Sequence, residues 1–389
     1  MKYNKIYTDC AATTPVDPRV IKAMMPYFFV KMGNPASMHK MGQDNFEVLE
    51  KCRQITADFV GAAKKEEIIF TGSATESNNL AIKGVMWANQ KNGKHLIVSS
   101  VEHDCILESA KWLSRNGFEV SYLAADEYGM IHPETVEAAI RPDTILVSVM
   151  HANNEIGTIN PVSEIAKVCH KHGVLFHTDA AQTCGKIEVN VQKNGADLLT
   201  ASSHKMYGPK GVAFLYIKTG TVIEAWTHGG GQEGGLRSST VNIPAIVGFA
   251  KAIEIANKEM ASEEKRLIVL RDKLIKNVLK EIPTAGLNGH PSKRLPNIAS
   301  FRFAYIEGES IIYWLNEYGI MASTGSACSS PKLTASHVLT ACGLRKEEIH
   351  GSLRLSLGKW TTEKDIDFII EKLQIVVEKL NKLSPFIKK

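Results

Sequence analysis

Short apolar runs recur along the first two thirds of the chain, separated by segments of mixed polarity. In several of these intervening segments the apolar residues recur every three or four positions, which is the period of an amphipathic helix. Strands that alternate with helices in this way are typical of a mostly parallel α/β sheet. The predicted strands are Ile68–Phe70, Leu96–Val98, Val120–Leu123, Ile145–Met150, Val174–His177, Leu198–Thr200 and Val212–Ile217.

Helical segments are predicted before, between and after these strands. Pro18 suits the first turn of a helix and Asp17 is a suitable cap, while Gly61 ends the next helical segment. The predicted helices are Pro18–Lys31, Gln43–Val60, Glu76–Ala88, Ile106–Arg115, Pro133–Ile140, Val162–His170 and a long one at Pro244–Glu281.

Beyond Gly286 the order of elements changes, and strands no longer alternate with helices. Predicted strands (Asn297–Phe303, Leu353–Leu357) mix with predicted helices (Ser310–Tyr318, Thr334–Ala341, Glu363–Leu383). This pattern indicates a smaller α+β domain. We therefore expect a large α/β domain of residues 15–260 with a mostly parallel seven-stranded sheet, and a small domain of residues 1–14 and 261–389.

Composition excludes several classes of protein. The 389 residues carry a formal net charge of +5, which is too mild to favour nucleic-acid binding. No apolar run reaches membrane-spanning length and the segment Met1–Lys5 lacks the apolar stretch of a signal peptide, so we expect no membrane association. The 7 cysteines are scattered and form no CxxC pair, which favours a reducing cytoplasm. Cys169, His170 and His172 lack the geometry of a metal site, and none is expected.

One lysine stands between two predicted strands, in Ser202-Ser203-His204-Lys205-Met206-Tyr207-Gly208. Burying an unpaired ammonium is costly, and burial makes the amine of such a lysine a usable nucleophile. The chemistry that uses it is Schiff-base formation with a carbonyl compound or with pyridoxal phosphate (PLP). A basic surface turn would have the same sequence, and this stretch alone does not decide between the two.

Polar residues follow five of the predicted strands, and ligands of open α/β sheets bind at the carboxyl ends of strands. The hydroxyl-rich start of a helix favours phosphate, although a simple capping box would look the same. A carboxylate can hold the pyridine nitrogen of PLP protonated, and a lysine can bind its aldehyde. The groups that follow the strands are Thr71–Glu76, Glu102–Asp104, Asn153–Glu155, Asp179–Gln182 and Ser202–Lys205.

An ordered set of motifs covers essentially the whole chain and resembles the cysteine desulfurases of the NifS/IscS type. These enzymes are class V aminotransferases of PLP fold type I. The matching segments are YTDCAATTPVDPRV (7–20), GNPAS (33–37), TGSATESNN (71–79), VEHD (101–104), HANNEIGTINP (151–161), HTDAAQTCGK (177–186), SSHKMYGPKG (202–211), HGGGQEGGLRSST (228–240), STGSACSS (323–330) and SLRLSLG (352–358).

The resemblance implies a role for each matching residue. Lys205 resembles the lysine that binds PLP, Asp179 the partner of its pyridine nitrogen, and Gln182 the donor to its ring hydroxyl. His103 resembles the residue stacked on the ring, with an acid–base role. Phosphate contacts are implied for Ala74, Thr75, Ser202 and His204, and from the other subunit for Thr240; cofactor or substrate contacts are implied for Asn154, Asn34 and Arg354.

Cys328 resembles the nucleophile that takes sulfur from L-cysteine as a persulfide, with release of alanine. A buried core cysteine is the alternative, but its small polar neighbours argue against that. The resemblance further implies a homodimer in the cytoplasm and a sulfur-acceptor protein, either an iron–sulfur scaffold or a thiolation enzyme. A selenocysteine lyase or another class V enzyme would share Lys205. A non-catalytic scaffold would need neither Lys205 nor Cys328.

The chain departs from the family pattern at three positions. Cys10 stands where Asn is usual, which places a second thiol near the predicted site. Gly234 stands where Arg is common, and Ser239 where Gly is common, beside Thr240. The chain also ends soon after Pro385, without the longer tail with which the housekeeping branch binds its scaffold protein.

Overall fold

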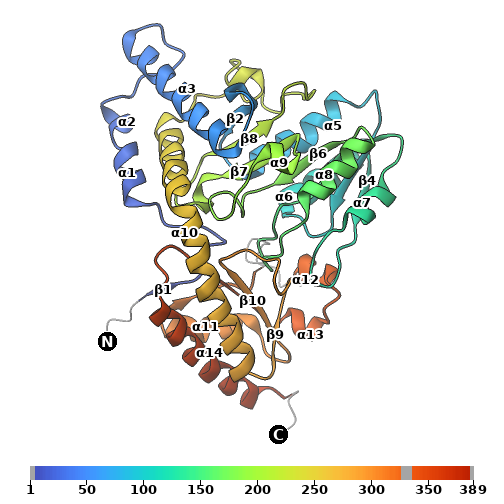
Figure 1. The fold of residues 1–389 in the computed structure, drawn as a ribbon, viewed down its shortest axis with the longest axis vertical. Coiled ribbons are helices and arrows are strands. Elements are labelled where there is room, and N and C mark those ends of the chain that lie inside the picture. The colour runs from blue at the N-terminus through green and yellow to red at the C-terminus, as the bar shows by residue number, and fades with distance from the viewer. Residues whose placement is uncertain (1–4, 326–334, 386–389) are drawn as a thin grey trace.

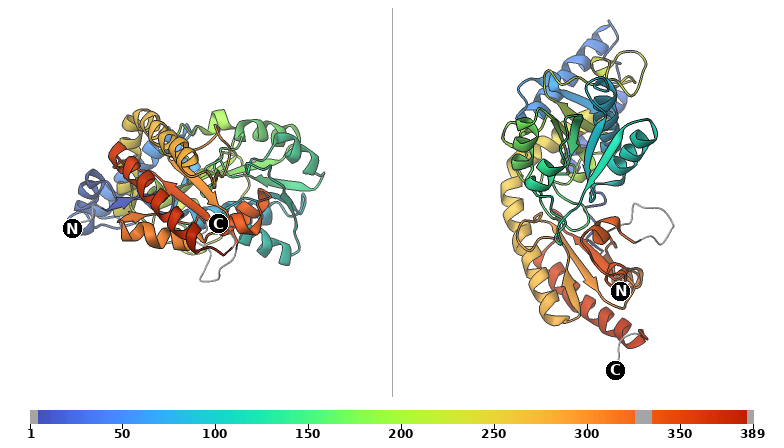
Figure 2. Two further views of the ribbon diagram at one scale, coloured as in Figure 1. Left: turned by 90° about the horizontal axis from the view of Figure 1, so that it is seen from below. Right: turned by 90° about the vertical axis from the view of Figure 1, so that its right-hand side faces the viewer.

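The protein folds into a larger and a smaller lobe that lie end to end (Figures 1 and 2). The computed structural model describes residues 5–325 and 335–385. A helix of 39 residues, α10 (Ile243–Glu281), runs from the larger lobe along one side of the molecule into the smaller one. Its amino-terminal part packs on the larger lobe and its carboxyl-terminal part on the smaller, so this helix connects the two cores.

A seven-stranded sheet forms the centre of the larger lobe, as the sequence predicts. All neighbouring strands are parallel except β8, which is antiparallel to both of its neighbours. Every predicted strand of this region is confirmed, with ends that differ by a few residues. In sheet order the strands are β2 (Ile68–Thr71), β8 (Ala213–Ile217), β7 (Leu198–Ser202), β6 (Leu175–Asp179), β5 (Thr144–Ser148), β3 (His95–Ser99) and β4 (Glu119–Leu123).

Helices cover both faces of this sheet, because alternate residues of each buried strand point to opposite faces. Leu199 and Phe176 pack against one helical layer, whereas Leu198 and Leu146 pack against the other. The first layer contains α3 (Lys40–Val60), α7 (Pro133–Ala139), α8 (Val162–Lys171) and the start of α10; the second contains α4 (Ala74–Asn79), a π-helical turn (Leu80–Gly84), α5 (Val85–Ala88) and α6 (Asp104–Arg115).

Two predicted helices differ from the observed ones. The segment predicted as one helix from Pro18 to Lys31 forms α1 (Pro18–Met24) and α2 (Pro26–Phe29). Pro26 lacks the N–H that would continue the ladder of hydrogen bonds, so the helix is interrupted before it. The helix predicted at Glu76–Ala88 begins earlier, at Ala74, and contains the π-helical turn at its centre.

The smaller lobe contains a three-stranded antiparallel sheet packed on helices. Its strand order is β12 (Ser352–Ser356), β10 (Ile298–Phe303) and β9 (Ala285–Leu287). A separate short pair joins β1 (Ile6–Tyr7) to β11 (Ile320–Met321), which places the amino-terminal segment on this lobe. The remaining elements are α9 (Val191–Asn194) in the larger lobe, and α11 (Gly308–Glu317), α12 (His337–Ala341), α13 (Lys346–Ile349) and α14 (Glu363–Leu383).

The division into residues 15–260 and residues 1–14 with 261–389 stays a prediction. It is supported by the hydrophobic cores, since Ile6 packs with α11, α14 and the end of α10, while the start of α10 packs with the large sheet. Among residues 5–325 and 335–385, no helix is both long and apolar enough to cross a membrane. The same residues contain no group of three or more His, Cys, Asp or Glu side chains arranged to hold a metal ion.

Candidate active site

The carboxyl ends of β6 and β7 bring two of the predicted residues to the same edge of the sheet. The strands are parallel neighbours, with Asp179 opposite Thr200. Asp179 is the last residue of β6, and Lys205 lies in the 3₁₀ turn that directly follows β7. The carboxylate and the amine therefore belong to adjacent strand ends, where a ligand of an open sheet binds.

The amine of Lys205 is held by the amino-terminal segment of the chain. Its Nζ donates hydrogen bonds to the carbonyl oxygens of Ala11 at 2.6 Å and Ala12 at 2.8 Å. Gln182, on the turn after β6, donates to the same Ala11 carbonyl at 3.0 Å. The backbone of residues 11 and 12 thus joins Lys205 to Gln182, two residues that the sequence predicted separately.

Asp179 is buried and accepts two hydrogen bonds. Its Oδ1 accepts from the backbone N–H of Ala181 at 2.8 Å, and its Oδ2 accepts from the side-chain amide of Asn78 at 2.7 Å. Asn78 belongs to the TGSATESNN motif, but its role could not be inferred from a polar residue within a helix.

Two imidazoles lie at strand ends of the site. His103 precedes α6 and caps it, because its Nδ1 accepts a hydrogen bond from the backbone N–H of Cys105 at 3.2 Å. His204 lies 3.2 Å from the Thr13 hydroxyl through its Nδ1. Burial, and then the charge of Lys205, lower the pKa of His204 to about 4, so this imidazole is neutral at neutral pH.

The predicted phosphate contacts lie after β2 and at the end of β7. The hydroxyl of Ser73 caps α4 by accepting from the backbone N–H of Glu76 at 3.1 Å, so the capping role that the sequence suggested is present. Thr75 is exposed and lines a cavity of about 310 Å³ with Ser73, Trp226 and Arg237. Ala74 is half-buried at the start of α4, and Ser202 is buried at the end of β7.

Arg354 and Asn154, two predicted substrate contacts, lie close together. Arg354 is on β12 with 3% of its side chain exposed, and its Nη1 donates to the Asn154 carbonyl at 2.8 Å. Its Nη2 donates to the Asp9 carboxylate at 2.8 Å. Its Nε is buried without a hydrogen-bond partner in the described part of the chain. The guanidinium is thus held between Asn154 and Asp9, and Asp9 is a residue that the sequence reasoning missed.

Asn34 and Thr240 lie in a different environment. Asn34 is exposed, accepts a hydrogen bond from the backbone of Ala36 at 3.0 Å, and lines a cavity of about 370 Å³ with Arg53 and Glu233. Thr240 is exposed in the loop before α10. The predicted roles of both residues stay predictions.

Two cysteines were singled out in the sequence, Cys328 and Cys10. Cys328 lies outside the described residues. Cys10 is buried, and burial raises the pKa of its thiol to about 12. A Cβ added at Gly358 would lie 2.5 Å from the Cys10 sulfur, so this thiol is closely packed against the backbone after β12. Cys10 is therefore protonated at neutral pH and a poor nucleophile.

Two carboxyl groups among the polar residues that follow the strands are buried, which the sequence did not predict. Glu102 accepts from the Ser99 hydroxyl at 2.6 Å and the Met150 N–H at 2.7 Å, and burial raises its pKa to about 8. Glu155 accepts from the Ser336 hydroxyl at 2.6 Å, and burial raises its pKa as well. Both belong to motifs that the sequence analysis quotes, VEHD (101–104) and HANNEIGTINP (151–161), but burial of a carboxyl group gives no signal in a sequence.

The polar atoms at this edge of the sheet fit PLP. Gln182 Oε1 and Ser203 Oγ are buried without a hydrogen-bond partner among the residues described, which is costly unless a ligand or water satisfies them. A lysine amine for an aldehyde, a carboxylate for a pyridine nitrogen and free side-chain polar atoms for ring substituents are the groups that this cofactor requires. The donor set is therefore consistent with a PLP site.

Comparisons with known proteins give the same family as the residues. The sequence pattern of the family described as aminotransferase class-V matches residues 6–369. Cysteine desulfurase IscS 1 of Archaeoglobus fulgidus is 51% identical over 379 residues, which are 97% of this chain and 98% of that protein.

Solved structures agree with the sequence relatives. A structure titled NifS-like protein has a TM-score of 0.91 at 38% identity and covers 97% of this chain and 100% of its own. A structure titled SspA in complex with cysteine has a TM-score of 0.79 at 35% identity and covers 92% of this chain and 100% of its own. Family, fold and the residues at the strand ends agree: this chain belongs to the class V aminotransferase family and, within it, to the cysteine desulfurases of the NifS/IscS type.

Proposed function

We propose that this protein binds PLP through Lys205 and removes sulfur from L-cysteine, leaving a persulfide on Cys328 and releasing L-alanine. The observation that carries the proposal is that the Lys205 amine, in the turn after β7, and Gln182, in the turn after β6, donate to the same Ala11 carbonyl, at the strand ends where the buried Asp179 ends β6. A structure titled as a complex with cysteine among the similar proteins supports the choice of substrate.

Residues of this chain would hold the cofactor and the substrate. Asp179, fixed by Asn78 and the Ala181 N–H, would pair with the pyridine nitrogen, and Gln182 would contact the ring hydroxyl. His103 would stack on the ring. Phosphate contacts would come from Ala74, Thr75, Ser202 and His204, with Thr240 from a second subunit; Arg354, Asn154 and Asn34 would contact the substrate.

When bound, PLP withdraws electrons from the substrate α-carbon, which makes its proton and its β-sulfur easier to remove. The Lys205 amine would accept the α-proton. The Cys328 thiolate would attack the substrate sulfur, so that a sulfur–sulfur bond forms while the carbon–sulfur bond breaks. Sulfur is oxidised and the β-carbon is reduced, so the products balance as alanine and a persulfide without an external oxidant.

The proposal is tested with Lys205→Ala. We expect the wild-type protein, incubated with PLP and reduced with borohydride, to gain the mass of reduced cofactor on the peptide that contains Lys205. The variant should show no such adduct and no alanine or sulfide from L-cysteine. Lys210→Ala is the matched control, because Lys210 is exposed on the same segment. Unchanged turnover in Lys205→Ala would overturn the proposal.

A homodimer is part of the proposal and rests on exposed apolar surface. Monomeric proteins rarely expose large contiguous apolar patches. The segment from the end of α1 to the start of α3 exposes its apolar side chains at the end of the larger lobe that lies away from the smaller lobe (Figure 1). We refer to these residues as the α1–α3 patch: Met25, Phe28, Phe29, Val30, Met32 and Met38.

The persulfide would be passed to an acceptor protein, either an iron–sulfur scaffold or an enzyme of nucleic-acid thiolation. A cytoplasmic location is proposed with it, because the six cysteines of the described residues are free thiols and a reducing compartment preserves them. Incubation of the protein labelled with ³⁵S from L-cysteine with extracts of its host would identify the acceptor by the label it gains.

A further inference from the structure

α12 is a short helix of the smaller lobe, and its first residues contact the larger lobe. It spans His337–Ala341 and is capped by Ser336, whose hydroxyl accepts from the backbone N–H of Leu339 at 3.2 Å. The helix lies at the junction of the two lobes (Figure 1). The proposed mechanism assigns it no part.

His337, the first residue of α12, contacts the residues on both sides of His103. Its Nε2 lies 2.8 Å from the backbone carbonyl oxygen of Glu102, and its Nδ1 lies 4.0 Å from the carboxylate of Asp104. A carbonyl oxygen can only accept a hydrogen bond, so Nε2 carries a proton and donates it. An imidazole of the smaller lobe thus holds the backbone directly before His103.

This contact is complementary to the contacts that the larger lobe makes with Glu102. The Glu102 carboxyl group accepts from the Ser99 hydroxyl at 2.6 Å and from the Met150 N–H at 2.7 Å. The larger lobe therefore fixes the side chain of Glu102, and His337 fixes its carbonyl.

His103 in turn organises the start of α6. Its carbonyl accepts from the backbone N–H groups of Ile106 at 2.9 Å and Leu107 at 3.3 Å, and its Nδ1 accepts from the N–H of Cys105 at 3.2 Å. Three consecutive amides are thus bonded to His103. A displacement of the Glu102 carbonyl would reach all three, because the two residues share a peptide bond.

Further contacts beside this hydrogen bond fix α12 on the larger lobe. The hydroxyl of Ser336 donates to the buried Glu155 carboxyl group at 2.6 Å. Apolar side chains of both lobes form one buried cluster around α12: Val101, Ile156, Val338, Leu339, Cys342 and Ile349. The contact of His337 with Glu102 is therefore part of a packed interface between the lobes.

We propose that His337 is a positioning residue for His103, and that it acts through the carbonyl of Glu102. Because His337 comes from the smaller lobe, the placement of His103 depends on how the two lobes pack. The inference rests on the proposed function, since His103 is the residue that would stack on PLP.

A merely structural His337 would make a different prediction. If it only stabilises the smaller lobe, its removal should raise amide exchange within α12 and leave the start of α6 unchanged. The test therefore measures hydrogen–deuterium exchange by mass spectrometry in the full-length protein without PLP, where turnover plays no part. The amides of Cys105, Ile106 and Leu107 report on His103, because each of them is bonded to it.

Three variants separate the hydrogen bond from the volume of the side chain. His337→Ala removes the donor. The amide nitrogen of Gln extends about as far from the backbone as Nε2 does, whereas that of Asn extends only about as far as Nδ1. We expect exchange at residues 105–107 to rise at least about threefold in His337→Ala and His337→Asn, and to stay within about twofold in His337→Gln. Lys346→Ala, an exposed position on α13, is the matched control.

With PLP bound, the same variants should change kcat and not KM. We expect kcat to fall at least about threefold in His337→Ala and His337→Asn and to be restored in His337→Gln. KM for L-cysteine should stay within about twofold, because the contacts of Arg354 with Asp9 and Asn154 are left intact.

The outcomes distinguish this inference from the proposed function. Unchanged exchange at residues 105–107 in both His337→Ala and His337→Asn, with the proteins folded by circular dichroism, would overturn the role of His337 and leave that of Lys205 intact. An equal rise in Lys346→Ala would overturn it too, since it would show a general loosening of the fold. If His337→Ala does not fold, His337→Asn decides alone. Unchanged turnover in Lys205→Ala would overturn the proposed function instead, whatever the exchange of the His337 variants.

Discussion

Arg354 on β12 donates a hydrogen bond at 2.8 Å to Asp9, a residue 345 positions earlier in the sequence. The same guanidinium donates to the carbonyl of Asn154 in the larger lobe. A side chain of the smaller lobe is thus fixed by the amino-terminal segment and by the loop after β5. Its Nε is buried without a partner within the described ranges, which is costly unless a ligand or water satisfies it.

This geometry predicts the effect of Arg354→Lys. A lysine can offer one ammonium but not the planar set of donors that contacts Asp9, Asn154 and a substrate carboxylate together. We expect KM for L-cysteine to rise about 10- to 100-fold, which corresponds to about 1.4 to 2.8 kcal/mol, with PLP binding unchanged. Steady-state kinetics and cofactor absorbance measure the two effects.

Arg302→Lys is the matched control for this substitution. Arg302 lies on β10, the strand next to β12, and contacts Leu287 and Glu348. It should leave KM within about twofold, because its partners are all within the smaller lobe. An equal rise of KM in both variants would mean that Arg354 acts through the folding of the smaller lobe and not through the substrate.

Cys328→Ser should abolish persulfide formation. At neutral pH an unperturbed thiol with a pKa of about 8.5 is a few per cent thiolate, whereas a serine hydroxyl is almost wholly protonated. We expect the variant to keep its PLP absorbance and to bind L-cysteine, but to release no alanine or sulfide. Mass spectrometry after incubation with L-cysteine should find an added sulfur on the Cys328 peptide of the wild type alone.

Cys10→Ala is the control thiol substitution. Cys10 is buried and its pKa is raised, so we expect the variant to gain sulfur on Cys328 as the wild type does. Sulfur found on Cys10 in the wild type, or full activity in Cys328→Ser, would contradict the assignment of the nucleophile.

The α1–α3 patch predicts that Phe29→Asp weakens the dimer. Phe29 is 83% exposed in the single chain, and a charge placed at a buried interface position is costly. We expect the dissociation constant from light scattering over a concentration series to rise at least about tenfold. Tyr313→Asp is the control, since Tyr313 is 61% exposed on α11 in the smaller lobe. A wild-type protein that is monomeric with PLP bound would refute the dimer itself.

The sequence predicted the large sheet and the strand ends well, because both are recorded in local patterns. Runs of apolar residues fix the buried strands, and the polar residues that follow them must meet at one edge of a parallel sheet. Lys205, Asp179 and Gln182 were found in this way. Pro26 is visible in the sequence, and a proline cannot continue the hydrogen-bond ladder of a helix. The segment was nevertheless predicted as one helix, because the residues on both sides of Pro26 keep a helical period.

Partners from distant segments could not be predicted. Asp9 with Arg354, Asn78 with Asp179 and Lys186 with the Lys205 carbonyl are pairs whose members lie 345, 101 and 19 positions apart. No periodicity relates them, and each polar residue alone is compatible with a surface position. These contacts depend on the fold. Packing of the amino-terminal segment beside β12 joins Asp9 to Arg354, α4 brings Asn78 to the end of β6, and the adjacent strands β6 and β7 bring their following turns together.

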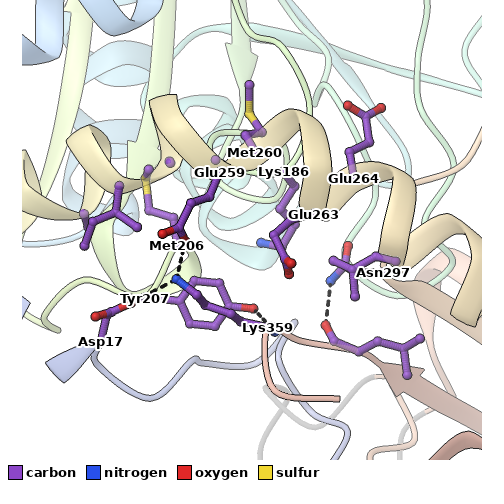
Figure 3. A pocket seen from close by; sticks show the side chains of 16 residues that line it. Asp17, Lys186, Met206, Tyr207, Glu259, Met260, Glu263, Glu264, Asn297 and Lys359 are labelled. Carbon is purple, nitrogen blue, oxygen red and sulfur yellow. Dashed lines mark hydrogen bonds and ion pairs between the residues drawn. The ribbon is translucent and has the colours of Figure 1, made fainter. Parts of the chain in front are cut away.

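Glu259 on α10 predicts a stability that depends on pH. It accepts from Lys359, which also contacts Asp17 (Figure 3), and it accepts from Arg19 as well. The cluster therefore joins the start of α1, α10 and the segment after β12. The hydrogen bond from Arg19, together with Lys359, lowers the pKa of Glu259 to about 2. A carboxyl group with a lowered pKa stabilises the fold above its unfolded pKa of about 4.3, and that contribution is lost as the pH falls toward 2.

We therefore expect Glu259→Gln to lower the free energy of unfolding by about 1 kcal/mol at pH 7. The value is modest because 33% of the Glu259 side chain is exposed and water screens the ion pairs. The difference between wild type and variant should shrink as the pH falls from about 4 to 2, because the wild-type carboxylate then becomes protonated. Urea unfolding at pH 7, 4 and 3 measures it, with Glu264→Gln on the same helix as control. A difference that stays constant over this range would show that Glu259 stabilises the protein by packing and not by its charge.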